Sequence, residues 1–297
     1  MLCRDVAPIS TDSVDTAVRR RVWSVMSQPK LIFLVLAPLV VGCATSPTGR
    51  TQLMLVSEQT AISASRQAYL SEIGRLEEDG KLLEDPAAAQ WVAGITGRLV
   101  AQAVQMRPDS GRWDWSVAII DEPDTVNAWC MAGGRMAVYT GLIRKLDPTD
   151  DEFAQVMGHE IAHALANHTA EKMSVAMATQ IGVLAIGLGS DDPRAMAAAA
   201  AAATLAVALP NSRVAESEAD QIGLEIAARA GYDPRAAVTL WQKMDQVGGS
   251  RPPQFLSTHP DPQNRQSRLA VLIPRMMPLY QAAGVRPVHP VTVVGSE

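Results

Sequence analysis

The chain has few of the residues that build disulfide-stabilised or aromatic-rich proteins. Of its 297 residues only three are cysteines, Cys3, Cys43 and Cys130, and 4% are aromatic. No disulfide framework can be built from so few cysteines, so the core must be stable through packing. The formal net charge is −5, and it becomes −7 without residues 1–42. This acidic balance lacks the basic footprint of a nucleic-acid-binding protein, and we expect no nucleic-acid partner.

Histidine is also scarce, and its distribution is uneven. Three of the five histidines fall within FAQVMGHEIAHALANHT at 153–169. Just upstream, Thr149 is followed three residues later by Glu152, a capping box that predicts the start of a helix. The surroundings are apolar, and burying imidazole and carboxyl groups there costs free energy that a bound metal would offset. We therefore favour a metal-binding helix over a surface helix with ordinary polar residues.

The spacing of the histidines predicts which of them can share a metal ion. Each residue turns a helix by about 100°, so His163 lies about 40° from His159, one turn along the same face. The HExxH pattern thus presents two imidazoles to one metal, with Glu160 close enough to reach a water on it. His168 would lie about 180° from His159 if the helix continued. We predict that His168 is on the opposite face and cannot bind the same metal.

A zinc site of this kind needs a third protein ligand. A histidine ten residues after the first would mark a metzincin, but Thr169 stands there. The other solution is a glutamate from a later helix, and ESEAD in the segment after Pro210 supplies one. Glu216 and Asp220 share a helix face, whereas Glu218 points about 160° away from Glu216. We predict Glu216 as the third ligand and Asp220 as the partner of a ligand histidine's other ring N–H; solvated surface acids are the alternative.

HEIAH together with ESEAD resembles metallopeptidase family forty-eight, which includes the HtpX heat-shock proteases, the CAAX prenyl protease and the BepA and LoiP envelope proteases. The resemblance spans almost the whole chain after residue 43 and is nearest to the bacterial lipoprotein members. Further matching stretches are SPTGRTQLMLVSEQ (46–59), VNAWCMAGGRMAVYTGLI (126–143), AGYDPRAAVTLWQKM (230–244) and FLSTHPDPQNR (255–265). The pattern of helix-like and strand-like segments indicates an α+β fold, and the resemblance implies a mostly helical zincin of the gluzincin type. It also implies that the strand Arg135–Tyr139 is the sheet edge that lines the active site.

The N-terminal region is similar to a lipoprotein signal. The apolar run from Leu31 to Gly42 has twelve residues, too few to span a bilayer but typical of a signal-peptide core. A small residue before Cys43 implies cleavage there and lipidation of Cys43, and Ala44 after it implies the outer membrane. Residues 1–25 do not resemble a signal, so we predict that translation starts at Met26; a long basic n-region is the alternative. A buried strand with a structural cysteine is the alternative to the signal itself.

We expect four segments along the chain: a signal region at 1–42, a lipid-anchored tether at 43–56, a zinc metallopeptidase domain at 57–286 and a flexible tail at 287–297. The apolar runs within 174–209 are each too short and interrupted to favour a membrane span. We predict a helical hairpin packed on the domain, with a lid over the cleft or a membrane-embedded pair as alternatives. Cys130 is expected to be a small buried hydrophobe, not a nucleophile.

The expected function is that of a zinc endopeptidase with one Zn²⁺ per chain. Glu160 would take the proton of the attacking water and pass it to the leaving amine. The resemblance implies a periplasmic enzyme, anchored to the outer membrane, that degrades unfolded or misassembled envelope proteins. A chaperone or assembly factor for outer-membrane proteins, acting with the assembly machinery and with secondary proteolysis, is the alternative. A structural lipoprotein with a vestigial metal site is a third interpretation.

His259 lies in the segment FLSTHPDPQNR, where two prolines restrict the direction of its imidazole. The resemblance places this loop over the metal cleft. His259 could occupy the fourth position of the zinc and keep the enzyme latent, or it could stabilise the oxyanion once substrate is bound. We favour latency, because an envelope protease with loose sequence selectivity needs restraint. An ordinary exposed histidine is the remaining alternative.

Overall fold

The computed structural model describes residues 42–187, 192–203, 209–247, 253–259 and 264–295. The chain divides into two compact units, Met1–Cys43 and Ala44–Glu297, and the fold below is that of the second. The predicted start at Met26 and the signal core lie outside the described residues. Cys43 is exposed and begins the short strand β1 (Cys43–Thr45).

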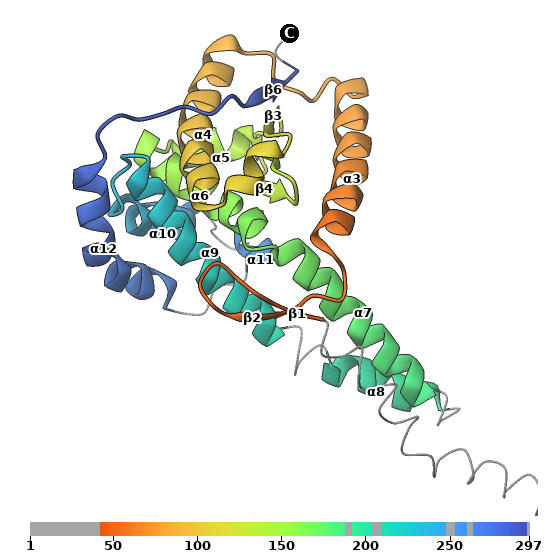
Figure 1. The fold of residues 1–297 in the computed structure, drawn as a ribbon. Coiled ribbons are helices and arrows are strands. Elements are labelled where there is room, and N and C mark those ends of the chain that lie inside the picture. Colours follow the sequence, from red (N-terminus) through yellow and green to blue (C-terminus); the bar gives the residue numbers. More distant parts are fainter. Residues whose placement is uncertain (1–41, 188–191, 204–208, 248–252, 260–263, 296–297) are drawn as a thin grey trace, which may run out of the picture. The chain divides into compact units, whose positions relative to one another are not determined.

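The domain contains a four-stranded mixed sheet (Figure 1). β3 pairs in parallel with β5 and with β6, whereas β4 pairs antiparallel with β5. Gly133 and Gly134 join β4 to β5 with φ of 87° and 84°, a conformation that glycine adopts without strain. The strands, in sheet order, are β4 (Ala128–Met131), β5 (Arg135–Tyr139), β3 (Ser116–Ile120) and β6 (Thr292–Val294).

Two expectations about this sheet are wrong. Arg135–Tyr139 is not the edge strand, because β4 covers one side of it and β3 the other. β5 is buried along nearly its whole length, while β4 alternates buried and half-buried residues as an edge strand does. Residues 287–297 are not simply a flexible tail either. The β-branched run Thr292–Val294 adds β6 to the sheet beside β3.

Helices make up most of the described chain and begin where their caps predict. Ser57 caps α3 by accepting from the Thr60 N–H, and Asp85 caps α4 by accepting from two N–H groups. The helices are α3 (Glu58–Glu78), α4 (Pro86–Met106), α5 (Thr140–Leu146), α6 (Asp150–Leu165), α7 (His168–Gly187), α8 (Pro193–Ala203), α9 (Leu209–Arg229), α10 (Ala236–Val247), α11 (Gln254–Thr258) and α12 (Arg265–Ala282), with the 3₁₀ helix η2 at Pro108–Arg112.

α6 lies in the core and is packed by α4, α9, α10 and β4 (Figure 1). The predicted capping box of Thr149 and Glu152 is present at its start. α6 and α9 approach until their backbones touch at two glycines. A Cβ on Gly158 would lie 2.9 Å from the Gly223 carbonyl oxygen, and one on Gly223 would lie 2.7 Å from the His159 nitrogen. This close approach allows a residue of α9 to reach the HExxH side chains of α6.

The segment predicted as a tether, 43–56, is more than a tether. β1 and β2 (Thr51–Leu53) form a two-stranded hairpin, and Ser46 and Gln52 are 5% and 2% exposed. The Gln52 amide donates to the carbonyl oxygen of Ala166 at the end of α6, at 2.7 Å. The hairpin is packed because its polar side chains find partners inside the domain.

α7 and α8 lie side by side, as the predicted helical hairpin requires (Figure 1). At the start of α7, Ala170 and Ser174 are buried, while Ile181 further along is 58% exposed. Parts of 174–209 lie outside the described residues. Among the helices that the structure describes, none combines the length and the apolar character needed to cross a bilayer.

Candidate metal centre

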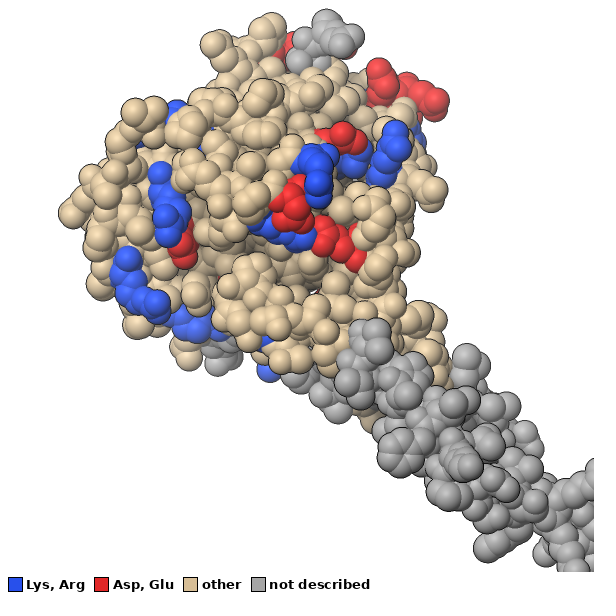
Figure 2. Space-filling model, viewed as in Figure 1, with Lys and Arg blue, Asp and Glu red and all other residues tan. Residues whose placement is uncertain are grey.

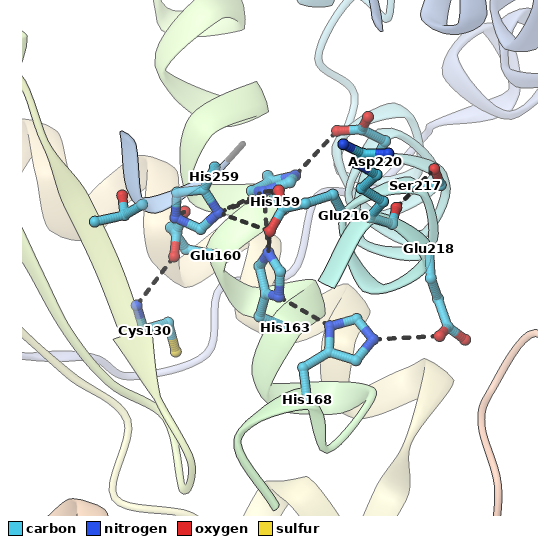
Figure 3. A network of polar contacts seen from close by, with 12 residues as sticks. Cys130, His159, Glu160, His163, His168, Glu216, Ser217, Glu218, Asp220 and His259 are labelled. Atoms are coloured by element: carbon cyan, nitrogen blue, oxygen red, sulfur yellow. Dashed lines mark hydrogen bonds and ion pairs between the residues drawn. The ribbon is translucent and has the colours of Figure 1, made fainter. Parts of the chain in front are cut away.

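Two imidazoles of α6 and one carboxylate of α9 converge at the centre of the domain (Figure 3). His159 Nε2 lies 3.0 Å from His163 Nε2 and 3.2 Å from Glu216 Oε2, and His163 Nε2 lies 3.5 Å from Glu216 Oε1. His159 and Glu216 are buried at 5% and 4% exposure. The three residues that the motifs single out as ligands are thus brought together.

The spacing of these atoms suits a tetrahedral metal ion. Zinc binds nitrogen and oxygen ligands at about 2.0–2.2 Å, which separates the vertices of a tetrahedron by about 3.3 Å. The observed separations of 3.0, 3.2 and 3.5 Å bracket that value. Two imidazole nitrogens and a carboxylate facing one another form the donor set that zinc prefers, and these residues therefore fit the zinc ion that the motifs predict.

His259 supplies a fourth ligand atom. Its Nδ1 lies 3.3 Å from His159 Nε2 and 3.2 Å from both carboxylate oxygens of Glu216. Ligand atoms of the four residues all lie within 4.8 Å of one another. The residue is 9% exposed and its ring stacks on Phe255, with ring centroids 4.6 Å apart, so His259 is not an ordinary exposed loop histidine. His259 could therefore serve as a fourth ligand beside the other three.

Glu160 joins the site to the edge strand β4. Its Oε2 accepts the backbone N–H of Cys130 at 3.3 Å. Its Oε1 is buried without a hydrogen-bond partner among the described residues, although His259 Nε2 lies 3.3 Å away. Burial raises the pKa of Glu160 and outweighs the nearby imidazoles, which makes the ionised carboxylate a stronger base. Burial likewise raises the pKa of Cys130, which agrees with a packing role for that thiol.

Asp220 lies behind His159. Its Oδ1 is 3.1 Å from His159 Nδ1, so the ring can keep Nε2 for a metal. The same carboxylate accepts from Arg265 Nε at 2.9 Å, and the guanidinium stacks on Trp241 at 3.7 Å. Arg265 is 2% exposed and was missed from the sequence, since a long-range ion pair leaves no periodic pattern. The arginine balances the charge of Asp220 and holds it in place.

The electrostatics of the metal-free site favour cation binding. Burial raises the pKa of Glu216, but hydrogen bonds with His159, His163 and His259 outweigh it and hold that pKa far below its usual range. Burial and the Arg265 charge lower the pKa of His159, but hydrogen bonds with Asp220 and Glu216 raise it to about 9. Burial holds the pKa of His163 well below its usual range. The site therefore carries a carboxylate charge and holds a proton where a metal would bind.

The prediction that His168 lies on the opposite face is wrong. α6 ends at Leu165, and Asn167 adopts a left-handed conformation with φ of 56°, which starts α7 in a new direction. His168 Nδ1 consequently lies 2.8 Å from His163 Nδ1. Glu218 is also not solvated, since it is 5% exposed and its Oε2 lies 3.2 Å from His168 Nε2. Both residues adjoin the metal centre without belonging to its four-residue group.

A model of peptidase family M48 matches residues 86–272, more than half of the chain. The chain belongs to peptidase family M48. The expected resemblance and the α+β, zincin-like fold are thereby confirmed. Members of M48 are zinc-dependent metallopeptidases, which is consistent with the His and Glu cluster found here.

Curated relatives of the M48 family share part of their length with this chain. The mitochondrial metalloendopeptidase OMA1 of Arabidopsis thaliana is 40% identical over 158 residues, 52% of this chain and 31% of that protein. OMA1 of Bos taurus is 31% identical over 253 residues, 81% of this chain and 47% of that protein. The β-barrel assembly-enhancing protease of Escherichia coli is 31% identical over 225 residues, 71% of this chain and 45% of that protein. The chain thus spans about half or less of these relatives.

Proposed function

We propose that the chain is a zinc-dependent endopeptidase that binds one Zn²⁺ through His159, His163 and Glu216. The observation that carries the proposal is the spacing of the three ligand atoms, which suits a tetrahedral ion, beside Glu160 Oε1, which has no hydrogen-bond partner among the described residues. Membership of M48 supports the reaction class.

Glu160 would perform the proton transfers of peptide hydrolysis. Zinc, when bound, would polarise the peptide carbonyl and lower the pKa of a coordinated water towards about 7. Glu160 would accept a proton from the attacking water at Oε1, which has no hydrogen-bond partner among the described residues. The same carboxyl would then donate that proton to the leaving amine. Its second oxygen stays fixed by the Cys130 N–H, so the carboxylate keeps its orientation through both steps.

The substrate would bind along β4. This strand is the edge of the sheet next to Glu160, and an extended peptide can add to such an edge through main-chain hydrogen bonds. Main-chain recognition gives loose sequence selectivity, which suits a protease that acts on unfolded chains.

We further propose that His259 keeps the free enzyme latent. Its Nδ1 lies 3.3 Å from His159 Nε2 and 3.2 Å from Glu216 Oε1, so it could fill the position that a bound zinc would offer to water or substrate. Displacing the imidazole would open that position, and an N–H of the ring could then donate to an oxyanion. We favour latency as the role of His259 in the enzyme without substrate. Oxyanion stabilisation is the alternative, and substitution of His259 distinguishes the two.

We propose that the enzyme works in the bacterial periplasm, anchored to the outer membrane through a lipid on Cys43. The apolar run before Cys43 and the name of the E. coli relative support this assignment, although the OMA1 relatives are described as mitochondrial. Its substrates would be unfolded or misassembled envelope proteins. Acidic and basic side chains lie beside one another on the face shown in Figure 2, which does not favour a nucleic-acid partner.

A chaperone or assembly factor with secondary proteolysis is the second candidate. The names of the assembly-enhancing relatives favour it, and the outer-membrane assembly machinery would then be the partner.

The proposed activity is tested by replacing Glu160 with Gln in the zinc-loaded full chain. Casein degradation should fall by at least about a thousandfold, because the base is lost while the ligands remain. Zinc content should stay at that of the wild type. Equal degradation by both proteins would refute the endopeptidase, and rescue of an envelope defect by the inactive variant would favour the chaperone.

A further inference from the structure

A second network of buried polar side chains lies beside the metal centre. Glu171 and Glu218 are each 5% exposed and His168 is 7% exposed, yet none of the three belongs to the metal group. Burying such groups is costly unless each is paired. The two glutamates are paired by Thr48 and Arg50 of the hairpin β1–β2, and His168 is paired by Glu218 and His163.

Arg50 bridges the two buried carboxylates. Its Nη1 and Nη2 donate to the two oxygens of Glu171 at 2.6 and 2.7 Å, and its Nε donates to Glu218 Oε2 at 2.8 Å. Thr48 Oγ1 donates to the other oxygen of Glu218 at 2.5 Å. The fork of the guanidinium therefore fixes a carboxylate of α7 and one of α9 at once.

If the His168 ring is neutral, the hydrogen-bond partners assign the protons along this network. Glu218 only accepts, so His168 Nε2 at 3.2 Å must carry a hydrogen. A neutral imidazole carries one hydrogen, which leaves His168 Nδ1 as an acceptor. His163 Nδ1 lies 2.8 Å from it and must be the donor. His163 Nε2 is then left with a free lone pair directed at the metal centre, the tautomer that a metal requires (Figure 3).

We propose that the β1–β2 hairpin holds the ligand His163 in its metal-binding tautomer and orientation, acting through Glu218 and His168. Thr48, Arg50, Glu218 and His168 are positioning residues, because they contact a ligand's support and not the reacting atoms. The two ligand histidines are thus supported differently. Asp220 of α9 contacts His159 directly, whereas His163 contacts His168 of α7, which is backed by Glu218 and the hairpin residue Arg50. This inference rests on the proposed zinc site.

Zinc affinity of the full chain, measured by competition with a chelator, tests the inference. His168→Leu removes the acceptor for the His163 N–H and should weaken zinc binding by about 10–100-fold. His168→Gln keeps one acceptor and one donor and should restore part of that loss. Cobalt substituted for zinc should show a shifted d–d absorption in the Leu variant, because the ligand ring has changed orientation.

Arg50 supplies a second, independent test. Arg50→Lys keeps the positive charge but loses the guanidinium that binds both carboxylates at once. This variant should bind zinc about tenfold more weakly. Combined with His168→Leu it should add little, because both changes act along one path. Arg98→Ala is the matched control. Arg98 is also half-buried and donates to the Ala230 carbonyl oxygen at 2.6 Å, but it has no route to His163.

The outcomes separate the two proposals. Unchanged zinc affinity in His168→Leu, or an additive loss in the double variant, would overturn the positioning role. So would an equal loss in Arg98→Ala, since the effect would then be general destabilisation. If His168→Leu does not fold, His168→Gln and Arg50→Lys must still show the smaller losses stated. Failure of the proposed function would look different, because the wild type itself would then bind no zinc.

Discussion

The contacts of His259 support two roles at the metal centre, latency and oxyanion stabilisation. These roles predict opposite effects of its removal on activity. Its Nδ1 stands where the fourth zinc ligand belongs, and its Nε2 is 3.3 Å from Glu160 Oε1. It thus contacts both the ligand cluster and the proposed base.

We expect His259→Ala to raise basal casein degradation several-fold, because the fourth corner of the metal becomes open. The measurement is initial rate of the zinc-loaded full chain at equal protein concentration. A lower kcat with unchanged KM would assign the residue to the oxyanion instead. If the rate of His259→Ala equals that of the wild type, both with and without membrane stress, His259 has neither the latency role nor the oxyanion role.

His159 makes zinc binding sensitive to pH. Its pKa in the metal-free protein is raised to about 9, so below that value a proton must leave before zinc can bind. The affinity is therefore highest above the raised pKa and falls as the pH falls, by about tenfold per unit for one proton. Chelator competition at about pH 8 and pH 6 should differ by roughly 100-fold. Equal affinities at the two values would contradict the assignment of His159 as a ligand.

Among the elements, the contact between α6 and α9 sets the distance from HExxH to Glu216. Gly223 makes this contact possible, because an added Cβ would lie 2.7 Å from the His159 nitrogen. Backbone atoms cannot yield as a flexible side chain can. The helices would have to separate, and the third ligand would move with α9.

We expect Gly223→Ala to lower the free energy of unfolding by about 1–3 kcal/mol and to weaken zinc binding together with it. Gly74→Ala on α3 is the control, since a Cβ there meets nothing within 4 Å. That variant should be unchanged or more stable by about 0.5–1 kcal/mol. Thermal unfolding and zinc content of both variants decide the point. Wild-type values for Gly223→Ala would mean that the helix contact does not control the site.

The parts of the fold that could be predicted from the sequence are those that depend on residues close together in the chain. The capping box of Thr149 and Glu152, the glycine turn at 133–134 and the HExxH periodicity each depend on neighbours in sequence. The edge strand was wrong because the sheet order depends on pairing β3 with β5 and with the distant β6. The predicted orientation of His168 was wrong because a single residue, Asn167, breaks the helix, although His168 lies outside the four-residue metal group as expected. Asparagine adopts the left-handed region more readily than most residues, so Asn167 was the sequence signal for this helix break.

At the scale of the whole molecule, we predict that a lipid on Cys43 attaches the protein to the membrane. Cys43→Ala should abolish lipidation, leaving the protein unprocessed or in the supernatant after membrane sedimentation. Fractionation with and without the substitution, followed by mass determination of the N-terminal peptide, measures this. Unchanged sedimentation with the outer membrane would contradict the lipid anchor while leaving the catalytic proposal untouched.

The central claim is that one zinc ion, held by His159, His163 and Glu216, makes this chain a peptidase. The most direct measurement is a zinc titration of the metal-free full chain in which bound zinc and casein degradation are followed together. Both should rise in parallel and stop at one zinc per chain, and Glu216→Ala should lose most of the tight zinc and the activity. Full degradation by the metal-free protein, or stoichiometric tight zinc in Glu216→Ala, would contradict the account.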